Sequence, residues 1–100
     1  MTRTDDIEAM YPYVATDLEP VRPSQVRVGD LLAARGPVGS GRWVGDRVLN
    51  AGYAGTDYVG GEKYEITVRQ TNWGHEITYG QPESIPLRRV RKDRIKGCAA

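Results

Sequence analysis

Six basic side chains fall within nine positions near the end of the chain, where residues 88–96 read RRVRKDRIK. Arginine and lysine side chains bind phosphates or carboxylates, and arginine can bind either group in a bidentate way. A single acid, Asp93, interrupts the cluster. The pattern predicts a surface that binds nucleic acid or an acidic protein. The candidate binding residues are Arg88, Arg89, Arg91, Lys92, Arg94 and Lys96.

Acidic side chains gather at the other end of the chain. Residues 1–20 contain five acids and one arginine, and the whole chain carries a formal net charge of only +1. A protein whose main task is to hold nucleic acid usually carries a larger positive charge. The balance therefore favours a protein partner, and a second copy of the chain could dock its acidic start on the basic end.

A glycine-rich stretch at residues 54–63 is predicted to be a long loop, with Tyr58 inside it and Tyr53 directly before it. Tyrosine offers a large contact area at a small cost in conformational entropy. Together with Trp73, these tyrosines could also stack on unpaired bases. The sequence leaves open whether the stretch is a contact loop or a plain mobile hairpin.

Residues for catalysis or metal binding are scarce. His75 is the only histidine and Cys98 the only cysteine. A structural zinc site needs four nitrogen or sulfur ligands, and the aspartates follow no calcium-loop spacing. No nucleophile motif surrounds any serine. The sequence therefore predicts neither an enzyme nor a metal, cofactor or small-molecule site.

Composition favours a cytoplasmic protein without a membrane partner. No apolar run approaches the roughly 20 residues that span a bilayer, and the first residues lack the apolar segment of a secretory signal. Cys98 cannot form an internal disulfide, as expected where thiols stay reduced.

Turn residues divide the chain into short elements. Asp5 and Glu8 fit a capped helix that ends before Pro12, and residues 15–24, which contain two prolines, are expected to be an extended connector. Five strands are predicted at 25–34, 42–53, 64–69, 73–79 and 85–91. Turn residues are expected at 36–41, at 71–72 and 74, and at 80–82. Residues 1–23 would then form a helix and connector, 24–91 a β-domain and 92–100 a basic tail.

Alternating apolar residues predict the core. A slip in the pattern at Gly45 and Asp46 predicts that Trp43 and Val48 face the same core. The core candidates are Val26, Val28, Leu32, Trp43, Val48, Ile66, Val68, Trp73, Ile77 and Leu87.

One region of the chain reads VRVGDLL, then a turn, then RWVGDRVL, and it is followed by two alternating strands and IPLRRVR. This arrangement resembles small SH3-like β-barrel accessory proteins of actinobacteria and their phages. The likeness covers about residues 24–91. It implies a mainly β fold, a small five-stranded barrel or roll with a short N-terminal helix. It also implies a host or phage protein as the partner, in the host cytoplasm if a phage encodes the chain, and it carries over no catalytic residue.

Two functions follow as hypotheses. The first is a non-enzymatic protein-interaction module. The alternative is a nucleic-acid-binding accessory protein that uses the basic C-terminal strand and tail. A third interpretation of the basic strand is a solvated sheet edge whose charges prevent aggregation.

Overall fold

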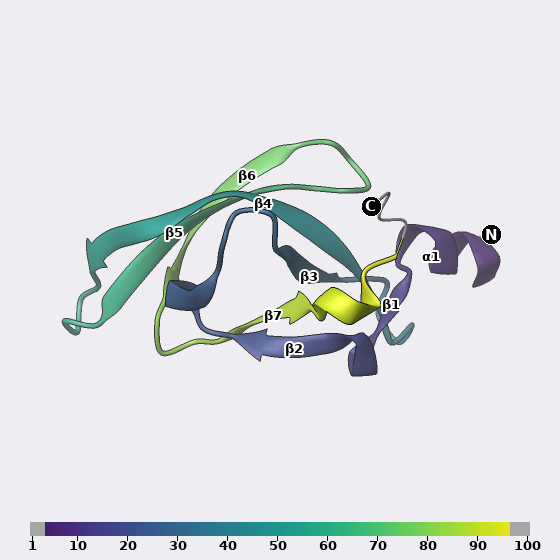
Figure 1. Cartoon of the computed structure of the whole chain (residues 1–100), viewed down its shortest axis with the longest axis horizontal. Coiled ribbons are helices and arrows are strands. Elements are labelled where there is room, and N and C mark those ends of the chain that lie inside the picture. The colour runs from purple at the N-terminus through teal and green to yellow at the C-terminus, as the bar shows by residue number, and fades with distance from the viewer. Residues whose placement is uncertain (1–3, 97–100) are drawn as a thin grey trace.

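The computed structural model describes residues 4–96, which form one helix and a mainly β structure (Figure 1). The elements are α1 (Thr4–Met10), β1 (Tyr13–Val14), η1 (Ala15–Asp17), β2 (Leu18–Val21), η2 (Pro23–Gln25), β3 (Leu31–Arg35), β4 (Arg42–Thr56), β5 (Glu62–Arg69), β6 (Glu76–Pro82), β7 (Leu87–Val90) and η3 (Lys92–Arg94), where η denotes a 3-10 helix. No helix in the described part of the chain is long and apolar enough to cross a membrane.

All seven strands belong to one antiparallel sheet in the order β2-β7-β3-β4-β5-β6, and β1 pairs with β4. Strands β3 to β6 form a meander, and β7 returns to lie between β3 and β2. Within residues 4–96, β2 and β6 each pair with one neighbour, so the sheet is open at these two edges. Figure 1 shows β4, β5 and β6 arching over β2 and β7.

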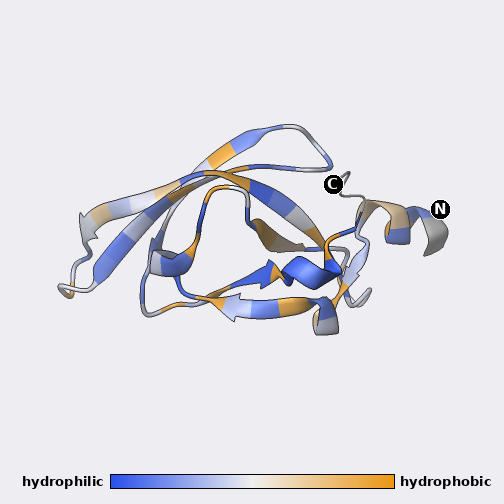
Figure 2. Cartoon of the chain, viewed as in Figure 1, coloured by the Kyte–Doolittle hydropathy of each residue, from blue (hydrophilic) through white to orange (hydrophobic). Residues whose placement is uncertain are grey.

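The hydrophobic core shows that the sheet bends over on itself. Val21 of β2 and Ile66 of β5 belong to one buried cluster, although three strands separate β2 from β5 in the sheet. Hydrophobic and hydrophilic residues alternate along β5, as Figure 2 shows, so one face of this strand points inward. The buried cluster consists of Val21, Val26, Leu32, Val48, Ile66 and Val68, with Ala51, Tyr79 and Leu87 packed against it.

A second, smaller buried group lies on the other face of the sheet, where Tyr13 contacts Lys96 near the end of the described residues. Tyr13 and Val90 are both buried, and the Tyr13 hydroxyl accepts a hydrogen bond of 2.9 Å from the backbone N–H of Lys96. Gly45 has no side chain, and the side chains of Leu31 and Val90 occupy the space next to it. Segments from both termini are therefore part of the fold.

Replacing Gly45 with alanine should lower the free energy of unfolding by about 1–2 kcal/mol. A Cβ atom at Gly45 would lie 2.9 Å from Leu31 Cβ and 3.2 Å from Val90 Cγ2, so the neighbours would have to move. Gly52 lies on the same strand, and a Cβ there would meet nothing within 4 Å. Gly52→Ala is thus the matched control and should be neutral. Urea unfolding measures both variants, and equal losses would contradict close packing at Gly45.

The structure has seven strands where the sequence predicts five. The additional strands, β1 and β2, lie at Tyr13–Val14 and within the expected connector, where Leu18–Val21 pairs with Leu87–Val90. Pro20 is compatible with this strand because β2 is at the edge of the sheet, where a missing N–H can face solvent. Prolines alone therefore did not distinguish an edge strand from a connector.

The strand predicted at 25–34 begins only at Leu31, and Val28 is 68% exposed instead of buried. Gly29 adopts a φ of +94°, and the N–H of Asp30 bonds to the carbonyl of Arg27. These contacts make a turn, so the alternation of Val26 and Val28 does not continue into a strand.

The slip predicted at Gly45 and Asp46 is also absent. Pairing between β3 and β4 is continuous from Trp43 to Arg47, and the irregularity lies between Val48 and Asn50. Trp43 and Val48 therefore face opposite sides of the sheet, and Val44 is buried on the side of Val48.

Two further core candidates are wrong. Trp73 is 60% exposed and Ile77 is 41% exposed. Strand β6 begins at Glu76, after a turn in which Gly74 has a φ of +74°, so Trp73 is a turn residue. Ile77 faces inward from β6, but this strand is at the open edge and little covers it.

Two local boundaries differ as well. Residues 80–82, predicted as a turn, continue β6, and the chain reverses after Pro82, where the N–H of Ile85 bonds to the Pro82 carbonyl. Helix α1 begins at Thr4, so Asp5 lies inside it instead of capping it.

Candidate functional site

Arg89 of the predicted basic surface is part of an ion-pair network inside the molecule. Its Nε lies 2.7 Å from Glu19 Oε2 and its Nη1 lies 3.3 Å from Asp30 Oδ2. Asp30 is buried, and its carboxylate also accepts the N–H of Arg27 at 2.9 Å. Arg89 therefore neutralises a buried acid between β2 and β3.

Three more basic residues have partners within the chain. Arg94 lies 3.9 Å from the buried carboxylate of Asp17, and Arg91 lies 3.7 Å from Asp93. Lys96 donates to the carbonyl of Pro12 at 3.0 Å. The acidic start and the basic end thus meet within one molecule.

Arg88 and Lys92 are exposed, and neither forms an ion pair within residues 4–96. Figure 2 shows η3, which contains Lys92, in the hydrophilic colour. Cys98 lies outside the described residues. A ligand of the whole basic cluster would have to compete with the carboxylates that pair with three of its six residues, Arg89, Arg91 and Arg94.

Tyr53 and Tyr58 lie near the far end of the β4–β5 hairpin. The Tyr58 side chain is fully exposed. Tyr53 packs edge-to-face on Tyr64, with ring centroids 5.7 Å apart and an interplanar angle of 76°. The predicted loop is shorter than expected, because β4 continues to Thr56 and β5 begins at Glu62.

Asp57 gives the turn between β4 and β5 a defined shape. Its Oδ1 accepts the N–H of Val59 at 3.0 Å and the N–H of Gly61 at 2.8 Å. The backbone N–H of Asp57 also bonds to the carbonyl of Gly61. These bonds fix the backbone of the hairpin tip. The two side chains at the tip, Tyr58 and Val59, are almost fully exposed.

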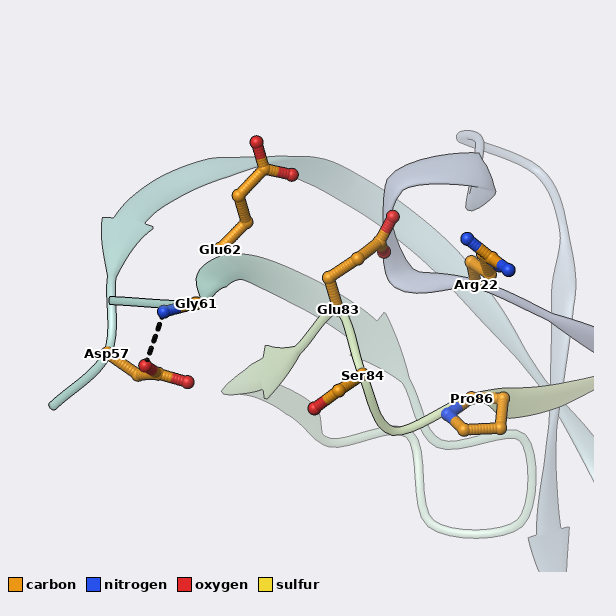
Figure 3. A pocket seen from close by; sticks show the side chains of 7 residues that line it. All are labelled: Arg22, Asp57, Gly61, Glu62, Glu83, Ser84 and Pro86. Carbon is orange, nitrogen blue, oxygen red and sulfur yellow. Dashed lines mark hydrogen bonds between the residues drawn. The ribbon is translucent and has the colours of Figure 1, made fainter. Parts of the chain in front are cut away.

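A cleft of about 560 Å³ lies beside this tip (Figure 3). Asp57 and Glu62 come from the hairpin, and Glu83 follows β6, so three carboxylates border the space. The only cation among the lining residues is Arg22, which lies on the side of Glu83 in Figure 3. The lining residues are Arg22, Asp57, Gly61, Glu62, Glu83, Ser84 and Pro86.

Glu83 is held in place by Ser24 of η2. The Ser24 backbone N–H donates to Glu83 Oε1 at 2.9 Å, and the Ser24 hydroxyl donates to Glu83 Oε2. These hydrogen bonds lower the pKa of Glu83, so its carboxylate stays charged into the acid range. Burial, together with Glu62 and Glu83, raises the pKa of Tyr64 at the same end of the sheet. The cleft therefore carries negative charge at neutral pH.

The remaining chemistry of the described residues is sparse. Within residues 4–96, no three His, Cys, Asp or Glu side chains converge as a metal ion would require. His75 is exposed in the turn before β6. Trp73 lies in that same turn, at the opposite end of β5 from the hairpin tip, so it does not form one stacking platform with Tyr53 and Tyr58.

Sequence reasoning identified the two tyrosines but missed the cleft beside them. Arg22, Glu62 and Glu83 come from three separate segments, and no motif links them. The loop that carries Asp57 was predicted, but the turn that carries Ser84 was expected at 80–82 and lies after Pro82. The proximity of the two was not predicted.

A scan against protein-family models found no match, and searches of curated proteins and of solved structures found no significant match.

Proposed function

We propose that the chain is a non-enzymatic protein-interaction module that binds its partner through the tip of the β4–β5 hairpin and the acidic cleft beside it. The observation that carries the proposal is the combination of outward-facing Tyr58 and Val59 with a cleft bordered by three carboxylates. Exposed aromatic and aliphatic side chains next to a charged hollow are typical of contact surfaces.

Charge indicates the chemistry of the partner. Asp57, Glu62 and Glu83 outnumber Arg22 at the cleft, so a basic or amide-rich segment of a protein is the complementary ligand. The SH3-like resemblance, with a host or phage protein as partner in the cytoplasm, belongs to the same proposal. Nucleic acid is the weaker alternative, because it would be repelled by this cleft and would compete with Glu19, Asp17 and Asp93 at the basic end.

Changing Tyr58 and Val59 to serine should lower capture of a protein partner from nuclease-treated lysate by about tenfold or more, since aromatic contacts dominate many interfaces. Val38→Ser is the matched control, because Val38 is also fully exposed but lies in the turn between β3 and β4. The bound fraction is measured by quantitative mass spectrometry. Equal capture by the two variants would contradict a hairpin interface.

Duplex and single-stranded DNA provide the second arm of the test. We expect no mobility shift at micromolar protein and low salt. A shift that disappears in the Arg88→Ala/Lys92→Ala variant, together with loss of all captured protein after nuclease treatment, would instead favour the nucleic-acid alternative.

A further inference from the structure

Three acidic residues are buried among the described residues, Asp17, Asp30 and Asp46, and Asp46 alone has no ion pair there. Asp17 pairs with Arg94 and Asp30 pairs with Arg89. The residue Asp46 is only 7% exposed, yet no ion pair joins it to a cation in the part of the chain that the structure describes. Aspartates are rarely buried unless they are paired.

One oxygen of this carboxylate is already used and the other is free. Asp46 Oδ1 accepts the N–H of Thr71 at 3.1 Å. The hydroxyl of Thr71 donates to the carbonyl of Gly45 at 2.6 Å, which fixes the turn against β4. Oδ2 accepts no hydrogen bond from residues 4–96. The carboxylate is therefore held in position with a single oxygen available.

A pocket of about 120 Å³ is lined in part by Asp46. Tyr11 and Trp73 supply aromatic walls, Val44 an aliphatic one, and Gln70 and Asn72 supply amides. The Tyr11 ring is fixed because it packs on Gly36, where a Cβ atom would lie 3.0 Å from Tyr11 Cγ. Trp73 is the exposed wall of the pocket, because 60% of this residue is exposed.

We propose that this pocket receives a lysine side chain of a partner protein, whose ammonium group pairs with Asp46 while its methylene stem lies along Trp73 and Tyr11. Aromatic faces attract ammonium groups, and lysine stems pack on apolar surfaces. A single free oxygen suits the point charge of lysine better than the planar fork of arginine, which binds both oxygens of a carboxylate. A volume of about 120 Å³ has room for the end of one side chain.

The lysine pocket lies at the turn between β5 and β6, whereas the acidic cleft lies at the turn between β4 and β5. The inference rests on the proposed function only in assuming a protein partner. A small alkylammonium ion tests the pocket without any partner, so the two proposals can fail separately.

The test is a titration of the ¹⁵N-labelled full chain with n-butylammonium chloride, followed by NMR. We expect saturable shifts at the Thr71 amide and the Trp73 indole N–H with millimolar affinity, because the ligand is small. Asp46→Asn keeps an oxygen for the Thr71 hydrogen bond and should weaken binding by about tenfold or more. If Asp46→Asn does not fold, Trp73→Ala replaces it, because that side chain is largely exposed.

The pH dependence of butylammonium binding distinguishes a binding role of Asp46 from a role in the fold alone. Burial raises the pKa of Asp46, against the opposing hydrogen bond from Thr71, so butylammonium should bind more tightly as pH rises through the acid range and should release a proton. The other titratable or charged groups that line the pocket are Arg35 of β3 and Tyr11. Tyr79 of β6 does not line it, but burial and the charge of Asp46 raise the pKa of Tyr79. Arg35 is cationic, so Arg35→Gln should tighten binding.

Two further ligands and a salt control complete the experiment. n-Butanol should cause no saturable shift and n-butylguanidinium should bind more weakly than n-butylammonium. Sodium chloride at the same ionic strength should leave Thr71 and Trp73 unchanged. The proposal is overturned if butylammonium causes no saturable shift, if n-butanol matches it, or if folded Asp46→Asn binds it equally well. The Tyr58→Ser/Val59→Ser variant should titrate like the wild type.

Discussion

Replacing Ile66 with alanine should lower the free energy of unfolding by about 3–4 kcal/mol. Ile66 is 0% exposed and belongs to the cluster in which residues from both halves of the bent sheet meet. Removing its side chain beyond Cβ takes apolar atoms out of the core and leaves a cavity between β5 and β2. For a domain of this size, the melting temperature should fall by roughly 12–30 °C. Urea and thermal unfolding followed by circular dichroism measure the change.

Ile77→Ala is the matched control for this prediction. Ile77 lies on the neighbouring strand, directly opposite Val68, and points to the same side of the sheet. It is 41% exposed because β6 is an open edge, so its loss should cost about 1 kcal/mol or less. Similar losses for the two isoleucines would show that the edge at β6 is covered in solution and would contradict the open sheet.

Replacing Arg89 with methionine should lower the free energy of unfolding by about 2–3 kcal/mol. Methionine keeps much of the side-chain length but leaves the buried Asp30 carboxylate without its cation. It also removes the 2.7 Å contact to Glu19, which links β7 to β2. The same urea unfolding experiment measures this loss.

Arg88→Met is the control for Arg89, because Arg88 is the preceding residue, is exposed and has no ion pair within residues 4–96. Its replacement should change the free energy of unfolding by about 0.5 kcal/mol or less. In the Arg89→Met background, Asp30→Asn should recover part of the lost stability, since the buried charge is then gone. Equal effects of Arg88→Met and Arg89→Met would refute a structural role for Arg89.

The contrast between these two arginines affects any test of nucleic-acid binding. A variant that removes all six basic residues would lose binding and stability together, because Arg89 and Arg94 neutralise buried aspartates. Arg88 and Lys92 are the positions of the basic end at which charge can be removed without breaking an ion pair or a side-chain hydrogen bond within residues 4–96, whereas Lys96 donates to the Pro12 carbonyl. The structure thus separates the charges that hold the sheet together from those that remain for a partner.

Local patterns were enough to predict a mainly β chain and its central strands. The alternation through Ile66 and Val68 correctly placed β5, and the glycines at 36–41 correctly placed a turn, in which Gly39 and Gly41 have positive φ. Leu87 was predicted to be a core residue, and it packs against the buried cluster. These signals extend over a few residues, so the sequence alone contains them.

The sequence determined that this protein is a mainly β chain with a basic end, an acidic start and a tyrosine-bearing hairpin. Only the tertiary structure decided that the basic end pairs with the acidic start, through contacts such as Arg89–Glu19, whose residues are 70 positions apart. It also placed Glu83 and Asp57 around one cleft and left Asp46 buried without an ion pair in the described residues. The physical reason is that strand alternation and turns depend on neighbours in the chain, whereas ion pairing and pockets depend on how a bent sheet brings distant segments together.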